Sequence, residues 1–153
     1  MRVYLDHNAT TPLRAEARAA MIAAMDVVGN PSSVHSEGRA AKMLVERARA
    51  QVAQLVGCKT TQVIFTSSAT EAAALAVAQK GRHGGVFGAL ATEHDCLGVW
   101  SEVAVDPALG AAGAGLVAVS AANSETGLLG DAGRVIGSTD AFSTICDITQ
   151  LAG

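Results

Sequence analysis

The sequence predicts an α/β fold with a mainly parallel sheet and flanking helices, and two observations carry that prediction. Half of the 153 residues are hydrophobic but only 3% are aromatic, and the many alanines and glycines suit closely packed helices and strands. Beyond residue 57, short apolar runs alternate with helical or loop segments, as the parallel strands of α/β domains do. These apolar runs are residues 62–65, 85–91, 116–122 and 144–148. Residues 101–115 leave two interpretations open, a short strand or only a loop.

Two helices are expected ahead of the sheet. Pro12 suits the first turn of the first helix, which should run to about Val28. Its apolar residues at helical spacing are Leu13, Ala17, Ala20, Met21 and Ala24. Turn residues at 29–33 predict a loop, and a second helix should then end at Gly57. The apolar stripe of the second helix consists of Ala41, Leu44, Ala48, Val52 and Leu55.

Charge and composition argue against several classes of protein. The formal net charge is −3 and the eight arginines and three lysines are scattered, so no basic patch for a nucleic acid is expected. No apolar run approaches the ~20 residues that span a bilayer, and the N-terminus lacks a signal-peptide pattern. A soluble cytoplasmic protein is therefore expected. Cys58, Cys96 and Cys146 lack metal-ligand or disulfide-framework spacing, which favours reduced structural thiols and no metal site.

Polar side chains follow each apolar run at the point where a strand should end. They occupy residues 66–71, 92–94 and 123–125, and Asp147 with Gln150. Open α/β sheets bind ligands at the carboxyl ends of their strands, so these groups should converge on one crevice. Four such groups in register predict a ligand site.

Residues 68–71, with the sequence SATE, have the S-x-x-E pattern of a capping box at a helix start. A helix start favours an anion, and phosphate above all, although Ser68 could also do no more than cap its helix. Other nucleotide sites fit poorly because there is no P-loop pattern. The glycine-rich stretches at 81–85 and 110–115 precede their strands, whereas a dinucleotide fingerprint has to follow its strand.

Three further side chains at strand ends each allow a functional and an ordinary role. His94 could stack on a planar ligand and move a proton, or it could be a surface hydrogen-bonding residue. Asn123 could donate to and accept from a ligand, or form an Asx turn before Gly127. Asp147 lies in an apolar run typical of a buried strand, where a carboxylate needs a partner such as a protonated heterocyclic nitrogen.

Six segments of the chain resemble, in order and broadly in spacing, those of the IscS/NifS-type cysteine desulfurases. These enzymes belong to the class V aminotransferase group and have the fold-type I architecture. The segments read VYLDHNATTP, GNPSSVHSEGRAA, VIFTSSATEAAALA, TEHDCL, ANSETGLL and CDITQLAG. The resemblance covers nearly all 153 residues. It implies a partial large domain of a fold-type I transferase, with residues 1–11 as an N-terminal arm and residues 12–153 as the N-terminal portion of the cofactor-binding large domain.

The resemblance also implies a cofactor, pyridoxal 5'-phosphate, and the residues that bind it. The matching cofactor-binding positions are Ala69, Thr70, His94, Asn123, Asp147 and Gln150. In the family, the turn that matches Ala69 and Thr70 holds the phosphate. The histidine that matches His94 stacks on the pyridine ring, and His94 is therefore the expected catalytic residue.

The remaining matched positions surround the ring and the substrate. Asn123 corresponds to a residue beside the cofactor and the substrate carboxylate, and Gln150 to one that hydrogen-bonds the ring hydroxyl. Asp147 corresponds to the aspartate that pairs with the pyridine nitrogen. That pairing keeps the nitrogen protonated, so the ring can act as an electron sink when a bond at the substrate α-carbon breaks.

The implied activity is a cysteine desulfurase reaction, in which L-cysteine becomes L-alanine and the sulfur remains on an enzyme cysteine as a persulfide. The implied partners are L-cysteine, a second copy in a homodimer, and a sulfur-acceptor protein, for example in iron–sulfur cluster assembly. Two alternatives stay open. One is another class V enzyme, such as a selenocysteine lyase, and the other is a degenerate, non-catalytic partner-binding module.

The sequence departs from the family pattern near the expected cofactor site. Ser68 stands where glycine is usual and Ala74 where asparagine is common. The stretch between His94 and Asn123 is also shorter than usual, as if a strand and a helix had been trimmed. These changes bear on fine specificity more than on the identity of the cofactor.

Several residues that the family needs for catalysis have no match within residues 1–153. The Schiff-base lysine, the persulfide-forming cysteine and the substrate-binding arginine lie downstream of the segment that matches DITQLAG. Lys42, Lys59 and Lys80 are expected on or beside helices, and nothing marks Cys96 as the sulfur carrier. A complementary C-terminal chain or segment that carries the Schiff-base lysine is therefore expected.

Overall fold

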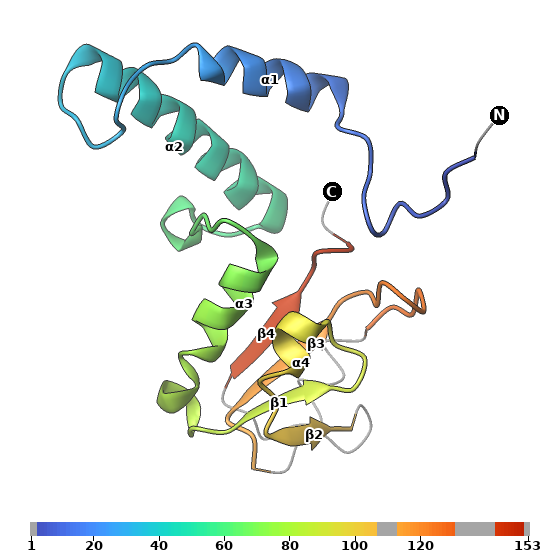
Figure 1. Ribbon diagram of the computed structural model, residues 1–153. Coiled ribbons are helices and arrows are strands. Elements are labelled where there is room, and N and C mark those ends of the chain that lie inside the picture. Colours follow the sequence, from blue (N-terminus) through green and yellow to red (C-terminus); the bar gives the residue numbers. More distant parts are fainter. Residues whose placement is uncertain (1–2, 107–112, 131–142, 152–153) are drawn as a thin grey trace. The chain divides into compact units, whose positions relative to one another are not determined.

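The structure is a computed structural model that describes residues 3–106, 113–130 and 143–151. Its chain forms two compact units, Met1–Ile64 and Phe65–Gly153. Figure 1 shows helices in the first unit, and a sheet with accompanying helices in the second. The expected division into an arm, residues 1–11, and a partial large domain, residues 12–153, stays a prediction.

The first unit contains helix α1 (Ala15–Met25), helix α2 (Ser36–Val56) and the 3-10 turn η1 (Thr60–Gln62). Helix α2 matches its prediction. The imidazole of His35 caps its first turn by accepting a hydrogen bond from the Gly38 N–H at 3.3 Å. Gly57 ends the helix in the left-handed region, with φ of 70°, a conformation that residues with a Cβ adopt only at a cost.

Helix α1 is shorter than predicted at both ends. Arg14 has an extended backbone, with ψ of 143°, so the first helical residue is Ala15 and the prediction that Pro12 opens the helix was wrong. The helix ends at Met25 rather than near Val28. Two consecutive valines followed by a glycine after Asp26 disfavour further helical turns, which accounts for the early end.

The apolar run at 62–65 does not form the predicted strand. The Val63 N–H donates to the Thr60 carbonyl at 3.2 Å, and the Val63 carbonyl accepts from the Arg49 guanidinium. These local contacts use the backbone groups that a strand ladder would need. Within the described residues, the four-stranded sheet does not include this run.

The second unit is built on the predicted parallel sheet. Its strands are β1 (Phe87–Leu90), β2 (Val103–Val105), β3 (Leu116–Ser120) and β4 (Ser143–Asp147). They are all parallel, in the order β2-β1-β3-β4 (Figure 1). Strand β2 decides between the two interpretations of residues 101–115 in favour of a short strand, although residues 107–112 lie outside the described part.

The helical elements of this unit are helix α3 (Ala69–Val77), the 3-10 turn η2 (Lys80–His83) and the short helix α4 (Asp95–Gly98). Alternating side chains of the strands divide between the two faces of the sheet. Phe87 on β1 and Leu116 on β3 join a core with Val77 of α3 and Leu97 of α4. The opposite face carries a second cluster centred on Val117 and Val119.

Candidate active site

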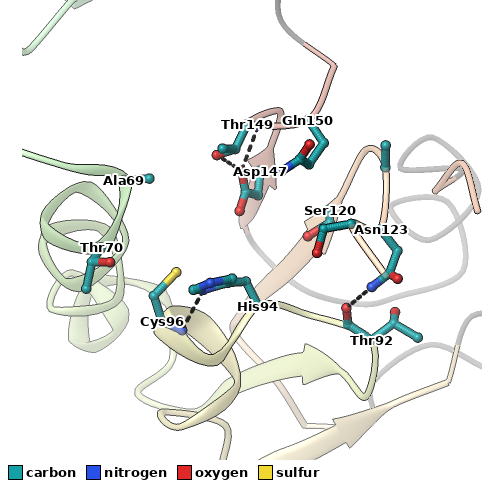
Figure 2. Close-up of a pocket in the computed structure, with 12 residues that line it drawn as sticks. Ala69, Thr70, Thr92, His94, Cys96, Ser120, Asn123, Asp147, Thr149 and Gln150 are labelled. Atoms are coloured by element: carbon teal, nitrogen blue, oxygen red, sulfur yellow. Dashed lines mark hydrogen bonds between the residues drawn. The ribbon is translucent and has the colours of Figure 1, made fainter. Parts of the chain in front are cut away.

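A cavity of about 200 Å³ lies where the strands end, and every predicted cofactor-binding residue lines it. Its lining residues are Ala69, Thr70, Thr92, His94, Cys96, Ser120, Ala122, Asn123, Ser124, Asp147, Thr149 and Gln150. Figure 2 shows Asp147, His94 and Asn123 around this space, with Ala69 and Thr70 on the side of helix α3. The structure therefore brings together residues that lie up to 81 positions apart in the sequence. His94, Asn123 and Asp147 follow or end strands, as the strand-end argument predicts, whereas Ala69 and Thr70 follow a run that forms no strand.

Helix α3 begins beside the cavity and is capped by Ser68, whose Oγ accepts from the Glu71 N–H at 3.2 Å. The return contact differs from a standard capping box. The Glu71 carboxylate accepts from the N–H and hydroxyl of Ser67, at 2.6 and 2.7 Å. These two bonds, the hydroxyl's first, lower the pKa of Glu71. Thr66 and Ser67 are not among the lining residues, whereas Ala69 and Thr70 in the first turn are.

His94 is placed by the turn that leads from β1 into α4. Its backbone is the N-cap of α4, and its Nδ1 accepts a hydrogen bond from the Cys96 N–H at 3.1 Å. An imidazole whose Nδ1 accepts carries its proton on Nε2 when neutral. The ring therefore combines a flat face for stacking with a potential proton donor at Nε2.

Asn123 forms the Asx turn that the sequence leaves open, and it also lines the cavity. Its Oδ1 accepts from the N–H groups of Glu125 and Thr126, at 3.1 and 2.8 Å, and so forms the expected Asx turn before Gly127. Its Nδ2 donates to the Thr92 carbonyl at 2.6 Å. An amide nitrogen carries two hydrogens, so one donor of this lining residue is not used by the Thr92 bond.

Asp147 ends strand β4, in register with Ser120 of β3. It is half-buried instead of fully buried as the sequence suggests, because β4 is an edge strand of the described sheet. Its Oδ1 accepts from the N–H and the hydroxyl of Thr149, at 2.9 and 2.6 Å. Both bonds reach the same oxygen, and they orient the carboxylate at the rim of the cavity. Gln150 also lines the cavity, two residues beyond Ile148.

Glu93 does not line the cavity but lies between two residues that do, Thr92 and His94, and sequence reasoning assigns it no role. It is only 9% exposed, and its carboxylate accepts from the Ser120 N–H at 2.8 Å and from the Ser120 hydroxyl at 2.5 Å. The signal in the sequence is its place between two polar residues, Thr92 and His94, directly after an apolar run. That signal locates Glu93 near the strand end but gives no hint of its partner 27 residues away.

The thiols near the cavity are poor nucleophiles at neutral pH. Burial raises the pKa of Cys96, and the negative charge of Asp147 raises it further. The same two causes, in the same order, raise the pKa of Cys146. Since the thiolate is the reactive form, both shifts disfavour Cys96 and Cys146 as nucleophiles.

Lys42, Lys59 and Lys80 all lie in the part of the chain that the structure describes. None of the three lysines is among the residues that line the cavity, and the ammonium of Lys80 lies 2.8 Å from the Glu102 carboxylate. Lys42 lies on α2 and Lys59 precedes η1, as expected.

Among the residues that the structure describes, no helix is both long and apolar enough to cross a membrane.

Comparison with known proteins finds relatives that cover nearly the whole chain and others that cover about half of it. Residues 3–108 match the family described as Aminotransferase class-V. A cysteine desulfurase of Frankia sp. (strain EuIK1) is 33% identical over 189 residues, covering 99% of this chain and 45% of the relative. A selenocysteine lyase of Homo sapiens is 45% identical over 83 residues, covering 54% of this chain and 19% of the relative.

A solved structure described as a NifS-like protein superposes with a TM-score of 0.78 at 25% identity, covering 97% of this chain and 49% of that chain. The predicted partial fold-type I architecture is thereby confirmed. The chain spans less than half the length of each of these three relatives. Because the family match extends over well more than half of its residues, the chain belongs to the class-V aminotransferase family.

Proposed function

We propose that residues 1–153 are the N-terminal part of a pyridoxal phosphate-dependent cysteine desulfurase. The complete enzyme would convert L-cysteine into L-alanine and leave the sulfur as a persulfide on an enzyme cysteine. One observation carries the proposal. In a chain of the class-V aminotransferase family, a family that depends on pyridoxal phosphate, one cavity is lined by a helix start, an imidazole, an amide and a carboxylate.

The lining residues fit the functional groups of this cofactor. The backbone N–H groups in the first turn of α3, at Ala69 and Thr70, have no partner within the helix and suit the phosphate. At the carboxylate end, Thr149 holds Oδ1 of Asp147, which leaves Oδ2 for the pyridine nitrogen. The cofactor, once bound, supplies an electron sink for bond breaking at the substrate α-carbon.

The other lining residues would orient the substrate and handle protons. The flat ring of His94, fixed by its bond from the Cys96 N–H, can stack on the pyridine and donate a proton from Nε2. The second amide hydrogen of Asn123 can reach a ring oxygen or the substrate carboxylate. Gln150 would hydrogen-bond the ring hydroxyl.

We infer that the site is shared with residues outside positions 1–153, and two features of the cavity support this. Its volume of about 200 Å³ is below the ~300–1,000 Å³ of typical ligand pockets, and none of the lysines lines it. We infer that a complementary C-terminal segment or chain supplies the Schiff-base lysine, the persulfide cysteine and the substrate-binding arginine. We further infer a cytoplasmic homodimer that passes sulfur to an acceptor protein, as in iron–sulfur cluster assembly.

The test is to purify the chain with and without this complement, add pyridoxal phosphate, reduce with borohydride, and map the labelled lysine. Label on the complement, together with sulfide release from L-cysteine, supports the proposal. The lone chain should show neither. Stable, stoichiometric label on Lys42, Lys59 or Lys80 of the lone chain would place the active site elsewhere. Failure of the assembled protein to bind the cofactor would favour the non-catalytic, partner-binding alternative.

A second candidate function is selenocysteine lyase, because the relative from Homo sapiens with that name is 45% identical over 83 residues. The two activities differ in the chalcogen that leaves the substrate, and the described cavity residues serve both. The ratio of kcat/KM for L-selenocysteine to that for L-cysteine separates them. Strong turnover of selenocysteine with little turnover of cysteine would establish the lyase.

A further inference from the structure

Glu93 makes a connection between two strand ends that the proposed chemistry does not use. It follows β1, whereas its partner Ser120 is the last residue of β3. The buried carboxylate accepts two hydrogen bonds from that one residue, from its N–H at 2.8 Å and from its hydroxyl at 2.5 Å. Hydrogen bonds to an ionised acceptor are roughly twice as strong as neutral ones, and burial strengthens them further.

The residues on either side of Glu93 both belong to the cavity. His94, directly after it, presents the imidazole, and Thr92, directly before it, accepts the 2.6 Å hydrogen bond from the Asn123 amide. The position of Glu93 therefore bears on two neighbours in the chain, the His94 imidazole and the Thr92 carbonyl that accepts from Asn123.

Ser120, the partner of Glu93, is in turn connected to Asp147. Ser120 is the register partner of Asp147 across β3 and β4. The next residue, Ala121, donates its N–H to the Asp147 carbonyl at 2.7 Å. A row of contacts thus runs across the carboxyl edge of the sheet, from the turn after β1 through Ser120 to Asp147, and Figure 2 shows Ser120 between Asn123 and Asp147 in this view.

We propose that Glu93 is a positioning residue, which fixes the His94 imidazole relative to Asn123 and Asp147 by holding Ser120 with two hydrogen bonds. The proposal rests on the cofactor function proposed above. Without the Glu93 carboxylate, the turn that carries His94 is free to shift along the end of β3. A remote substitution that misplaces a catalytic group by about 1 Å can lower the rate by about a hundredfold.

The sheet offers a matched control, Glu102, which makes the same kind of contact at the other end of β1. Its carboxylate accepts from the Phe87 N–H at 3.0 Å and from the Lys80 ammonium at 2.8 Å. Neither Glu102 nor its two partners lines the cavity. Loss of the contacts that Glu102 makes with Phe87 and Lys80 should therefore affect stability alone.

The experiment compares Glu93→Gln, Ser120→Ala and Glu102→Gln in the protein assembled with its lysine-bearing complement. Three quantities are measured at a temperature where every variant is folded: kcat and KM for L-cysteine, the visible circular dichroism of the bound cofactor, and the pH titration of His94 by NMR in cofactor-free protein. For Glu93→Gln we expect kcat to fall about ten- to a hundredfold, with altered dichroism and an altered His94 titration. Ser120→Ala should give the same changes to a smaller extent, and Glu102→Gln should lower only the thermal midpoint.

Two results overturn the inference, and they differ from a failure of the proposed function. If Glu93→Gln lowers the thermal midpoint but keeps the wild-type kcat, dichroism and His94 titration, Glu93 is merely structural. The same conclusion follows if Glu102→Gln changes these three readouts as much as Glu93→Gln does. A wild-type protein that binds no cofactor contradicts the proposed function, and the NMR titration still decides whether Glu93 holds the imidazole in place.

Discussion

A glutamate accepts a hydrogen bond from a strand N–H at each end of the sheet, a contact that we call a glutamate clamp. At the carboxyl end, Glu93 is 9% exposed and holds Ser120. At the amino end, Glu102 is exposed, holds the Phe87 N–H, and is paired with Lys80. The bond from Lys80, and then that from Phe87, lower the pKa of Glu102.

The difference between the two ends lies in what surrounds the clamp. Beside Glu93, the chain presents an imidazole, an amide and a carboxylate to one cavity. Beside Glu102, its neighbours Phe87 and Val103 begin strands and pack into the sheet. A clamp of similar geometry can therefore serve function at one edge and stability at the other, and variants at each end should separate the two.

The largest expected effect is at the carboxyl end. In the assembled enzyme, Asp147→Asn should keep the cofactor but lower the rate of desulfuration about a hundredfold or more, equivalent to roughly 3 kcal/mol of transition-state stabilisation. The amide cannot keep the pyridine nitrogen protonated, so the electron sink weakens. Steady-state kinetics with L-cysteine measure the change, with Glu102→Gln as the control. Near-normal turnover would remove Asp147 from the mechanism.

The amino end should instead be sensitive to packing. A Cβ added at Gly115, just before β3, would lie 1.2 Å from the His83 carbonyl oxygen, so the backbone has to move to admit it. We expect Gly115→Ala to lower the free energy of unfolding by about 3 kcal/mol or more, at or beyond the upper end of the usual cost of overpacking.

Urea unfolding measures this loss, and Gly81→Ala in η2 is the control, because a Cβ there meets nothing within 4 Å. A Gly115→Ala protein as stable as the Gly81→Ala protein would show that the backbone segments at His83 and Gly115 can move apart without cost. Packing would then not distinguish the amino end from the carboxyl end.

The parts of the fold that could be predicted are those with a local cause. The runs that form β1, β3 and β4 are apolar and bounded by polar or turn residues, and Gly57 carries its helix-ending signal in its own backbone freedom. The convergence of His94, Asn123 and Asp147 followed from one topological rule, that parallel strands end at the same edge.

The parts that could not be predicted depend on contacts distant in sequence. Residues 62–65 have the composition of a strand, but Arg49, 14 positions earlier, binds the Val63 carbonyl. The partner of Glu93 is 27 positions away. The half-buried state of Asp147 depends on β4 being an edge strand in the described sheet, which no local pattern reveals.

A smaller effect is expected at the helix start beside the cavity. Ser68→Ala removes the Oγ that caps the Glu71 N–H and should cost about 1 kcal/mol of stability, whereas Ser68→Gly should cost only a few tenths. Glycine is the usual family residue at this position, so Ser68→Gly should also keep cofactor affinity. Urea unfolding and cofactor titration check both values. A Ser68→Ala protein with unchanged stability would mean that the Glu71–Ser67 contacts hold the turn without the cap.

The smallest expected effect is the pH dependence of the amino-end clamp. Because the pKa of Glu102 is lowered in the folded chain, the carboxylate contributes stability that is fully present above the unfolded pKa of about 4.3. This contribution is lost as the pH falls through the lower, folded value. The urea midpoint of wild type should therefore exceed that of Glu102→Gln at pH 7, and the difference should shrink steadily below about pH 4.3. Exposed ion pairs contribute little, so the difference in urea midpoint is small, but its direction is fixed. A difference that grows on acidification would show that the Lys80 contact does not stabilise the charged form of Glu102. The two ends of the sheet would then differ in electrostatics as well as in function.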